Sequence, residues 1–165
     1  MKIAVITDVH ANLPALQAAL QAIRQEGSDL IVHTGDTIGI GPFPAETLDL
    51  LLNTPQLQFV MGNHDPGILF TSVQELIRSY TGEATRFYLE SYEFDGVYIE
   101  HGNQYEAANS FDRQKYFLTD KLPEPVLNQP WGTLFLVHVI NDIKRRKPYF
   151  DKVLPFGDYL KWLLL

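Results

Sequence analysis

Four short motifs bring together carboxylate, imidazole and amide side chains. They are Asp8-Val9-His10, Gly35-Asp36, Gly62-Asn63-His64-Asp65 and His101-Gly102-Asn103. Carboxylate oxygens and imidazole nitrogens together suit divalent Mn, Fe, Zn and similar ions. The chain has no cysteine, which excludes thiolate ligands as well as disulfides. The motifs therefore predict a metal site built from oxygen and nitrogen ligands.

The motifs differ in specificity. An Asp-x-His pair arises easily by chance, whereas this composition predicts about 0.001 occurrences of Gly-Asn-His-Asp. The alternative for the set is a group of loop side chains that cap helices, and the ordered succession of motifs weighs against it. For His101 the alternative is a histidine at a strand end that makes a local hydrogen bond.

Each motif follows a predicted strand. Hydrophobic patterns predict strands at 2–7, 29–33 and 57–61, a helix capped by Asn12 and ended by Gly27, and a helix at 45–53. Such alternation predicts an α/β fold, with a central parallel sheet and flanking helices. Ligands of parallel sheets bind beyond the carboxyl ends of the strands, where these motifs would meet. A further strand, 97–100, would deliver His101 in the same way.

The ordered motifs resemble those of the calcineurin-like metallophosphoesterase superfamily. Its pattern is Asp-x-His, Gly-Asp, Gly-Asn-His-Asp/Glu, His and Gly-His-x-His, and the match runs from residue 1 to about residue 105. The opening DVHANLPAL with GIGPFP is similar to small bacterial phosphodiesterase-like members. The segment VYIEHGNQYEAANSF is more similar to a larger branch. The resemblance implies a metallophosphatase-type sheet sandwich with flanking helices.

The resemblance also implies two divalent metal ions, Mn, Fe, Zn or similar. Asp8 and His10 would bind the first ion, Asn63 and His101 the second, and Asp36 would bridge both. A metal-bound hydroxide would then hydrolyse a phosphate mono- or diester.

Two further roles follow from the same resemblance. His64 would stabilise or protonate the leaving oxygen instead of binding metal. Asp65 would orient His64 from behind. We also expect Asn103 to touch the substrate phosphate, and the substrate to be a phosphorylated small molecule or a nucleotide-type compound.

The final Gly-His-x-His of the family is absent. The only histidine after His101 is His138, which we interpret as structural, with replacement of a lost ligand as the alternative. His33, on a buried strand, is also interpreted as structural. The apolar pattern at 159–165 has no helix cap, so we expect a chain that is incomplete at its C-terminus. The alternative function is an impaired or inactive scaffold, or a truncated fragment lacking the last two His ligands.

The rest of the chain is predicted to belong to the same domain, 1–165, with 106–165 more helical. The specific predictions are a capping box at Ser72 and Glu75, a helix at 83–90, a hairpin turning at Asp95-Gly96, a proline-marked loop at 123–130 and an ambiguous strand or helix at 132–147.

The charge and composition of the chain limit the kinds of partner and the cellular location that we expect. The 165 residues carry a formal net charge of -7, which argues against general nucleic-acid binding. The basic run at 144–147 is interpreted as a solvated helix end, with binding of a phosphate or anionic headgroup as the alternative. No apolar stretch is long enough for a transmembrane helix, and the N-terminus is interpreted as a strand. With no cysteines, we expect a cytoplasmic protein.

Overall fold

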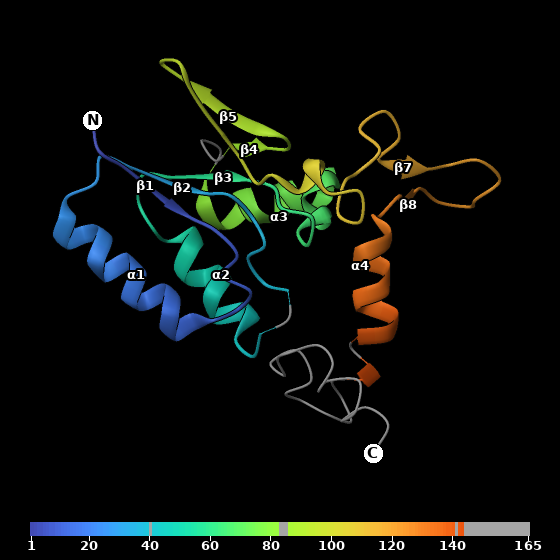
Figure 1. Cartoon of the computed structure of the whole chain (residues 1–165), viewed down its shortest axis with the longest axis horizontal. Helices are drawn as coiled ribbons and strands as arrows, with labels where there is room; N and C mark the ends of the chain where they lie inside the picture. The colour runs from blue at the N-terminus through green and yellow to red at the C-terminus, as the bar shows by residue number, and fades with distance from the viewer. Residues whose placement is uncertain (40, 83–85, 141, 144–165) are drawn as a thin grey trace.

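The computed structural model describes residues 1–39, 41–82, 86–140 and 142–143 (Figure 1). Its strands are β1 (Ile3–Ile6), β2 (Leu30–His33), β3 (Leu57–Val60), β4 (Phe87–Tyr88), β5 (Ser91–Phe94), β6 (Val97–Glu100), β7 (Phe117–Leu118) and β8 (Val126–Leu127). Its helices are α1 (Leu13–Glu26), α2 (Pro44–Leu52), η1 (Pro66–Leu69), α3 (Thr71–Thr81), η2 (Asn103–Tyr105), α4 (Trp131–Phe135) and η3 (Leu136–Ile140).

The first four strands form one parallel sheet in the order β1-β2-β3-β4. Ile6 pairs with His33, and His33 pairs with Phe59, so the strands end in register. The predicted α/β fold with alternating strands and helices is therefore confirmed over the first three strands. The register also brings the loops that follow the strands to one edge of the sheet.

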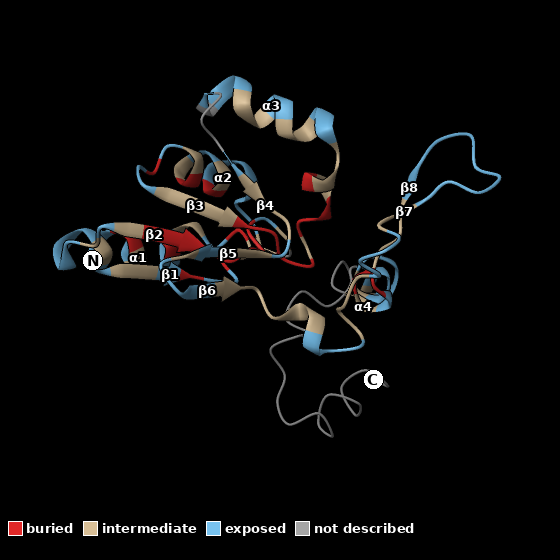
Figure 2. Ribbon diagram, turned by 90° about the horizontal axis from the view of Figure 1, so that it is seen from above, coloured by how far each residue is buried: buried red, intermediate tan, exposed pale blue. Residues whose placement is uncertain are grey.

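Helices α1 and α2 cover the same face of this sheet (Figure 1). Leu16 and Leu20 of α1 are buried with Ile6, Ile31 and Leu51 in the main core. The Asn12 side chain accepts a hydrogen bond from the Ala15 amide, and Gly27 ends the helix with a left-handed φ of 66°. Figure 2 shows buried residues concentrated in the sheet and in the loops beyond its strands.

The hairpin of β5 and β6 lies on the other side of the sheet from α1 and α2 (Figure 1). Its turn is Asp95-Gly96, with φ values of 44° and 77°. Two successive positive φ angles define the tight turn that matches the twist of paired strands. The predicted hairpin is confirmed, and it places His101 directly after β6.

Two local predictions in the middle of the chain are wrong. The predicted helix at 83–90 is contradicted by β4, which pairs in parallel with β3 through Phe87 and Tyr88. Aromatic residues fit a sheet surface well, and the pairing overrides the weak helical pattern. The capping box fails because α3 already begins at Thr71, and its start has no side-chain cap.

The described part of the C-terminal region contains short strands as well as helices. Residues 106–130 contain the short β7–β8 pair, and the 123–130 loop includes β8. The described part of the ambiguous 132–147 segment is helical as far as Ile140, through α4 and η3. The basic run at 144–147 and the apolar tail lie outside the described residues. No described helix is long and apolar enough to cross a membrane.

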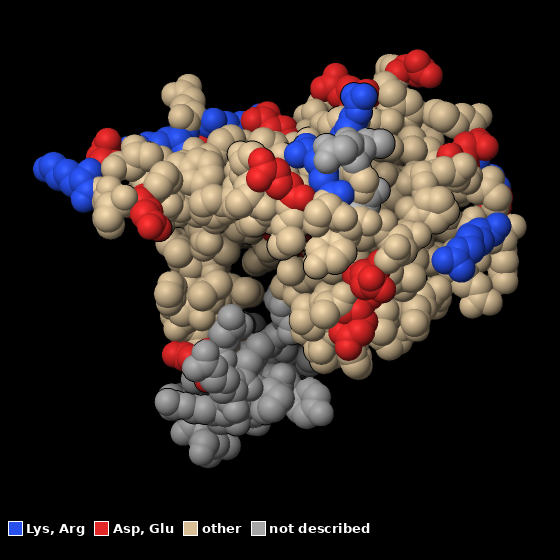
Figure 3. Space-filling view, turned by 180° about the vertical axis from the view of Figure 1, so that it is seen from behind, with Lys and Arg blue, Asp and Glu red and all other residues tan. Residues whose placement is uncertain are grey.

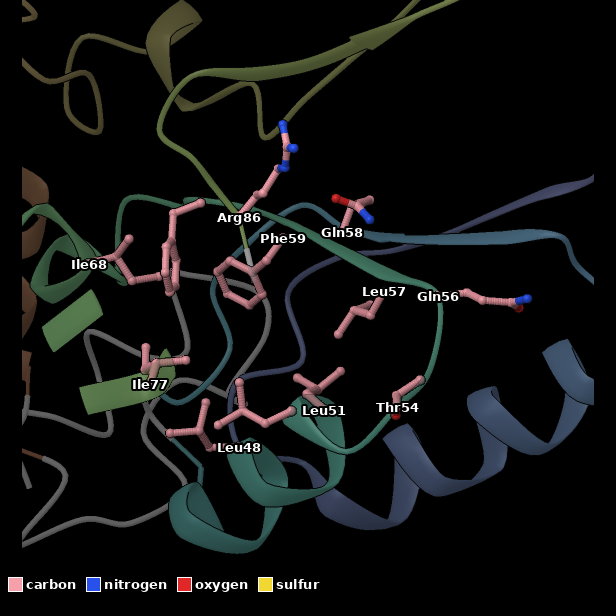
Figure 4. A pocket seen from close by; sticks show the side chains of 12 residues that line it. Leu48, Leu51, Thr54, Gln56, Leu57, Gln58, Phe59, Ile68, Ile77 and Arg86 are labelled. Carbon is pink, nitrogen blue, oxygen red and sulfur yellow. The ribbon is translucent and has the colours of Figure 1, made fainter. Parts of the chain in front are cut away.

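A cavity of about 260 Å³ lies between α2, β3 and α3 (Figure 4). Its wall is mainly apolar, with Leu48, Leu51 and Phe59 among the side chains that face it. None of the predicted site residues lines this cavity. On the surface shown in Figure 3, Lys and Arg side chains stand among Asp and Glu and form no continuous basic patch.

Candidate metal centre

Backbone hydrogen bonds join the loop after β1 to the loop after β2. The amides of Asp8, His10 and Ala11 donate to the carbonyls of Gly35, Asp36 and Thr37, at 3.2, 2.9 and 2.7 Å. Both loops leave the ordinary strand conformation, with φ values of 52° at Asp8, 46° at His10 and 59° at Asp36. Left-handed backbone at non-glycine residues is unfavourable by roughly 1 kcal/mol or more and clusters at functional sites.

Two glycines allow the loops after β2 and β3 to touch. A Cβ on Gly35 would collide with the backbone of Gly62, and a Cβ on Gly62 would collide with the Asp36 carboxylate. Gly35 also has a left-handed φ of 101°. The glycines of both motifs are therefore required by close approach, which brings Asp36 beside Asn63 and His64.

Asp65 holds these two loops together through its carboxylate. It accepts hydrogen bonds from the amides of Asp36 at 2.5 Å, Thr37 at 3.0 Å and Gly62 at 3.2 Å. Burial raises the pKa of Asp65, while the Thr37 amide opposes that rise. The predicted contact with the His64 side chain is not among the hydrogen bonds of the described residues, and the Asp65 carboxylate binds backbone amides instead. Asp65 thus positions Asp36 more directly than His64.

Asp36 lies at the centre of the predicted residues. Its Oδ1 accepts a hydrogen bond from the His64 amide at 2.9 Å. Its Oδ2 lies 3.8 Å from His10 Nε2, 3.9 Å from His64 Nε2 and 3.6 Å from His101 Nε2. One oxygen is therefore fixed by the backbone, while the other faces three imidazole nitrogens.

Two ligand groups share this Asp36 oxygen. In the first, the ligand atoms of Asp8, His10 and Asp36 all lie within 4.8 Å of one another, with 3.4 Å between Asp8 Oδ1 and His10 Nε2. In the second, His101 Nε2 lies 3.0 Å from Asn63 Oδ1 and 3.6 Å from Asp36 Oδ2. These two groups contain the residues that the family resemblance assigned to two ions, and their assignment as metal ligands stays a prediction.

The spacing within each set fits a shared ion. Ligand atoms held about 2.1 Å from one ion lie about 3.0 Å apart at right angles and about 3.4 Å apart in a tetrahedron. The distances of 3.0 and 3.4 Å reach these values, and those of 3.6 and 3.8 Å need only small inward movement. The Nε2 atoms of His10 and His101 point into the site, as their distances to Asp36 Oδ2 show. Their buried Nδ1 atoms have no hydrogen-bond partner among the described residues.

A polar cavity of about 310 Å³ opens over these residues. It is lined by Asp8, His10, Asp36, Asn63, His64, His101, Gly102, Asn103, Glu106 and Asn109. Glu106 and Asn109 were missed by the sequence analysis, since two polar residues in a loop carry no recognisable spacing signal. Asn103 lines the wall as expected, and its contact with a phosphate stays a prediction.

The other two histidines lie apart from this cavity. His138 is exposed on η3, and it is not among the residues of the cavity wall. His33 is fully buried, stacks on Phe59 with 5.1 Å between ring centroids, and accepts the Gly35 amide at Nδ1 at 2.9 Å. Burial lowers the pKa of His33 to about 4. His33 therefore stays neutral and supports the loop that carries Asp36.

Comparison with protein families places this arrangement in a class. Residues 1–161 match the model of the calcineurin-like phosphoesterases, so the chain belongs to that family. A curated relative, "Uncharacterized protein MJ0912" of Methanocaldococcus jannaschii, is 45% identical over 67 residues. These residues are 41% of this chain and 27% of that relative, so the chain spans little more than a quarter of its length.

Two solved structures are also similar. Yfce, a phosphoesterase from E. coli, is 22% identical with a TM-score of 0.48, and the match covers 62% of this chain and 58% of Yfce. A metallophosphoesterase from Sphaerobacter thermophilus is 28% identical with a TM-score of 0.38, covering 57% of this chain and 44% of that one.

Proposed function

We propose that this chain hydrolyses phosphate esters with two divalent ions held at the carboxyl edge of its sheet. The observation that carries the proposal is the position of three imidazole Nε2 atoms within 3.9 Å of Asp36 Oδ2. Membership of the calcineurin-like phosphoesterases supports the same reaction. Asp8, His10 and Asp36 would hold one ion, and Asp36, Asn63 and His101 the other. Bound divalent ions would polarise the phosphate and lower the pKa of a coordinated water.

His64 is the residue we assign to the leaving group. His64 lines the cavity, its Nε2 lies 3.9 Å from Asp36 Oδ2, and its ring packs edge to face against His10 at 5.6 Å between centroids. The His64 amide is tied to Asp36 Oδ1, so the position of the imidazole is set by the same carboxylate that the ions would share. From there a protonated imidazole can donate a proton to the departing oxygen, an effect commonly worth about 10²–10⁴ in rate.

The cavity supports a small substrate. Its volume of about 310 Å³ lies at the small end of the range for ligand pockets, roughly 300–1,000 Å³. A phosphorylated small molecule or a nucleotide-type ester suits this size, as monoester or diester. The polar wall of carboxylates, imidazoles and amides suits a phosphate group and bound cations better than an apolar ligand.

Metal content and turnover test the proposal together. The full chain, stripped of metal and dialysed against Mn²⁺, should retain two ions per chain and hydrolyse p-nitrophenyl phosphate or its bis ester. The double variant Asn63→Ala, His64→Ala should lose at least 100-fold in turnover. His138→Ala, which changes an exposed histidine outside the cavity wall, is the matched control. Turnover no higher than that of the double variant would exclude catalysis, and a metal content near zero would indicate a scaffold.

A leaving-group series tests the role of His64. p-Nitrophenolate leaves without help, whereas an alkoxide needs a proton. His64→Gln should therefore slow an alkyl phosphate ester more than the nitrophenyl ester. Equal losses on both esters would assign His64 to binding instead of proton transfer.

A further inference from the structure

The side-chain amide of Asn63 has two chemically different ends of nearly the same shape. The oxygen can bind a cation, but the NH₂ group has no available lone pair and cannot. Rotating the amide by half a turn would exchange the two ends and remove the ligand. Asn63 is buried, so its orientation must be set by the groups around it.

Asn109 contacts the NH₂ end of this amide. Asn63 Nδ2 donates a long hydrogen bond of 3.5 Å to Asn109 Oδ1, while Asn63 Oδ1 faces His101 Nε2 at 3.0 Å. An amide oxygen accepts hydrogen bonds and cannot donate them. Asn109 Oδ1 therefore selects the NH₂ end of Asn63 and leaves the oxygen directed at the site.

Glu106 sets the orientation of Asn109 in turn. Asn109 Nδ2 donates a hydrogen bond to Glu106 Oε2. An ionised carboxylate can only accept, so this contact has one polarity. The two hydrogen bonds therefore have a fixed direction: Asn63 donates to Asn109, and Asn109 donates to Glu106. Because the Glu106 carboxylate can only accept, it disfavours the orientation of Asn109 in which the amide oxygen and nitrogen are exchanged.

The backbone around Asn109 is fixed as well. Asn103 Nδ2 donates to the Asn109 carbonyl at 2.9 Å, and the Gly132 amide donates to the Ala108 carbonyl at 2.8 Å. Thr133, buried at the start of α4, donates to the Asn63 carbonyl at 3.4 Å. The 103–109 segment and α4 are therefore both hydrogen-bonded to Asn63, through Asn109 and Thr133 respectively.

We propose that Asn109, oriented by Glu106, is a positioning residue that keeps the Asn63 oxygen directed at the second metal position. This inference rests on the proposed function, because it concerns a ligand of one of its two ions. Asn109 lines the cavity wall, yet it acts through Asn63. Substituting a residue that hydrogen-bonds to a metal ligand commonly lowers metal affinity about 10–100-fold.

Metal affinity measures the effect without relying on turnover. Calorimetric titration of the full, metal-free chain with Mn²⁺ should show that Asn109→Ala weakens one of two sites about tenfold or more. Asn128→Ala is the matched control, since it removes another asparagine side chain that donates a hydrogen bond, to the Lys115 carbonyl, and that lies outside the cavity wall. Thermal unfolding of the metal-free proteins shows whether a variant is folded.

The double variant Glu106→Gln, Asn109→Asp separates positioning from simple support. It exchanges the amide and the carboxylate between the two positions at unchanged net charge. The new amide at position 106 can donate to the new carboxylate at position 109, which can still accept from Asn63. Affinity should return to within about threefold of the original chain.

Two results would overturn this inference alone. They are unchanged affinity in Asn109→Ala and no recovery of affinity in the double variant. If neither the original chain nor the Asn63→Ala variant binds Mn²⁺ in the titration, the proposed function fails and this inference fails with it.

Discussion

At the scale of single residues, the site depends on the different contacts of the two carboxylate oxygens of Asp36. One of its oxygens is held by the His64 amide, and the other faces three imidazoles. Asp65 fixes the backbone beneath it through three amides. The sequence motifs contain all of these residues, but the family resemblance implied that Asp65 orients the His64 side chain. A carboxylate next to a histidine in sequence suggests a contact between them, whereas the folded loops offer it three backbone donors first.

His33 makes the stability of the chain depend on pH. The pKa of His33 is about 4 in the folded chain and about 6.5 when unfolded. Since the unfolded state binds the proton more tightly, protonation of this histidine favours unfolding. The unfolding free energy is therefore unaffected above pH 6.5 and falls as the pH is lowered from 6.5 toward 4. Between pH 7.5 and pH 5 the loss should be about 2 kcal/mol of unfolding free energy.

Urea unfolding of the metal-free chain at these two pH values measures the His33 effect. His33→Asn keeps an acceptor for the Gly35 amide and removes the titrating ring, so its unfolding free energy should fall less on acidification. The other histidines are common to both proteins and cancel in the comparison. An equal fall in both proteins would contradict the assignment.

At the scale of elements, the strands place the chemistry and the loops shape it. The alternation of strands and helices was predictable as far as Val60, because long local patterns determine those elements. The two-residue strand β4 was not, since Phe87 and Tyr88 become a strand only by pairing with β3. Glu106 and Asn109 were equally hidden, because their position depends on how the 101–110 segment folds back over Asn63.

The N-terminal cap of α1 gives an element-scale prediction. Asn12 follows the loop of Asp8 and His10 directly, and its side chain accepts the Ala15 amide at 3.3 Å. Asn12→Ala should lower the unfolding free energy by about 1 kcal/mol. Asn12→Asp should retain most of it, since a carboxylate also caps and suits the positive end of a helix. Urea unfolding of the metal-free chains measures both, and an Asn12→Ala variant as stable as the original chain would show that the cap contributes nothing.

At the scale of the whole molecule, a chain with net charge -7 also brings carboxylate oxygens of Asp8 and Asp36 within 4.8 Å of each other. Binding two divalent ions would add four positive charges at this edge of the sheet. Stability and metal binding are therefore linked, because an ion that binds the folded chain alone shifts the unfolding equilibrium by mass action.

Mn²⁺ should accordingly stabilise the chain against heat. At one hundred times the dissociation constant, each site contributes about 2.7 kcal/mol, and for a domain of this size each kcal/mol raises Tm by about 2–4 °C. Scanning calorimetry should thus show a rise of about 5 °C or more for one filled site. Ca²⁺ at equal concentration should do much less, because it prefers oxygen ligands and each set includes an imidazole nitrogen. Asp36→Asn, which removes the shared charge, should abolish most of the Mn²⁺ effect, and an equal rise in that variant would mean that the ions bind elsewhere.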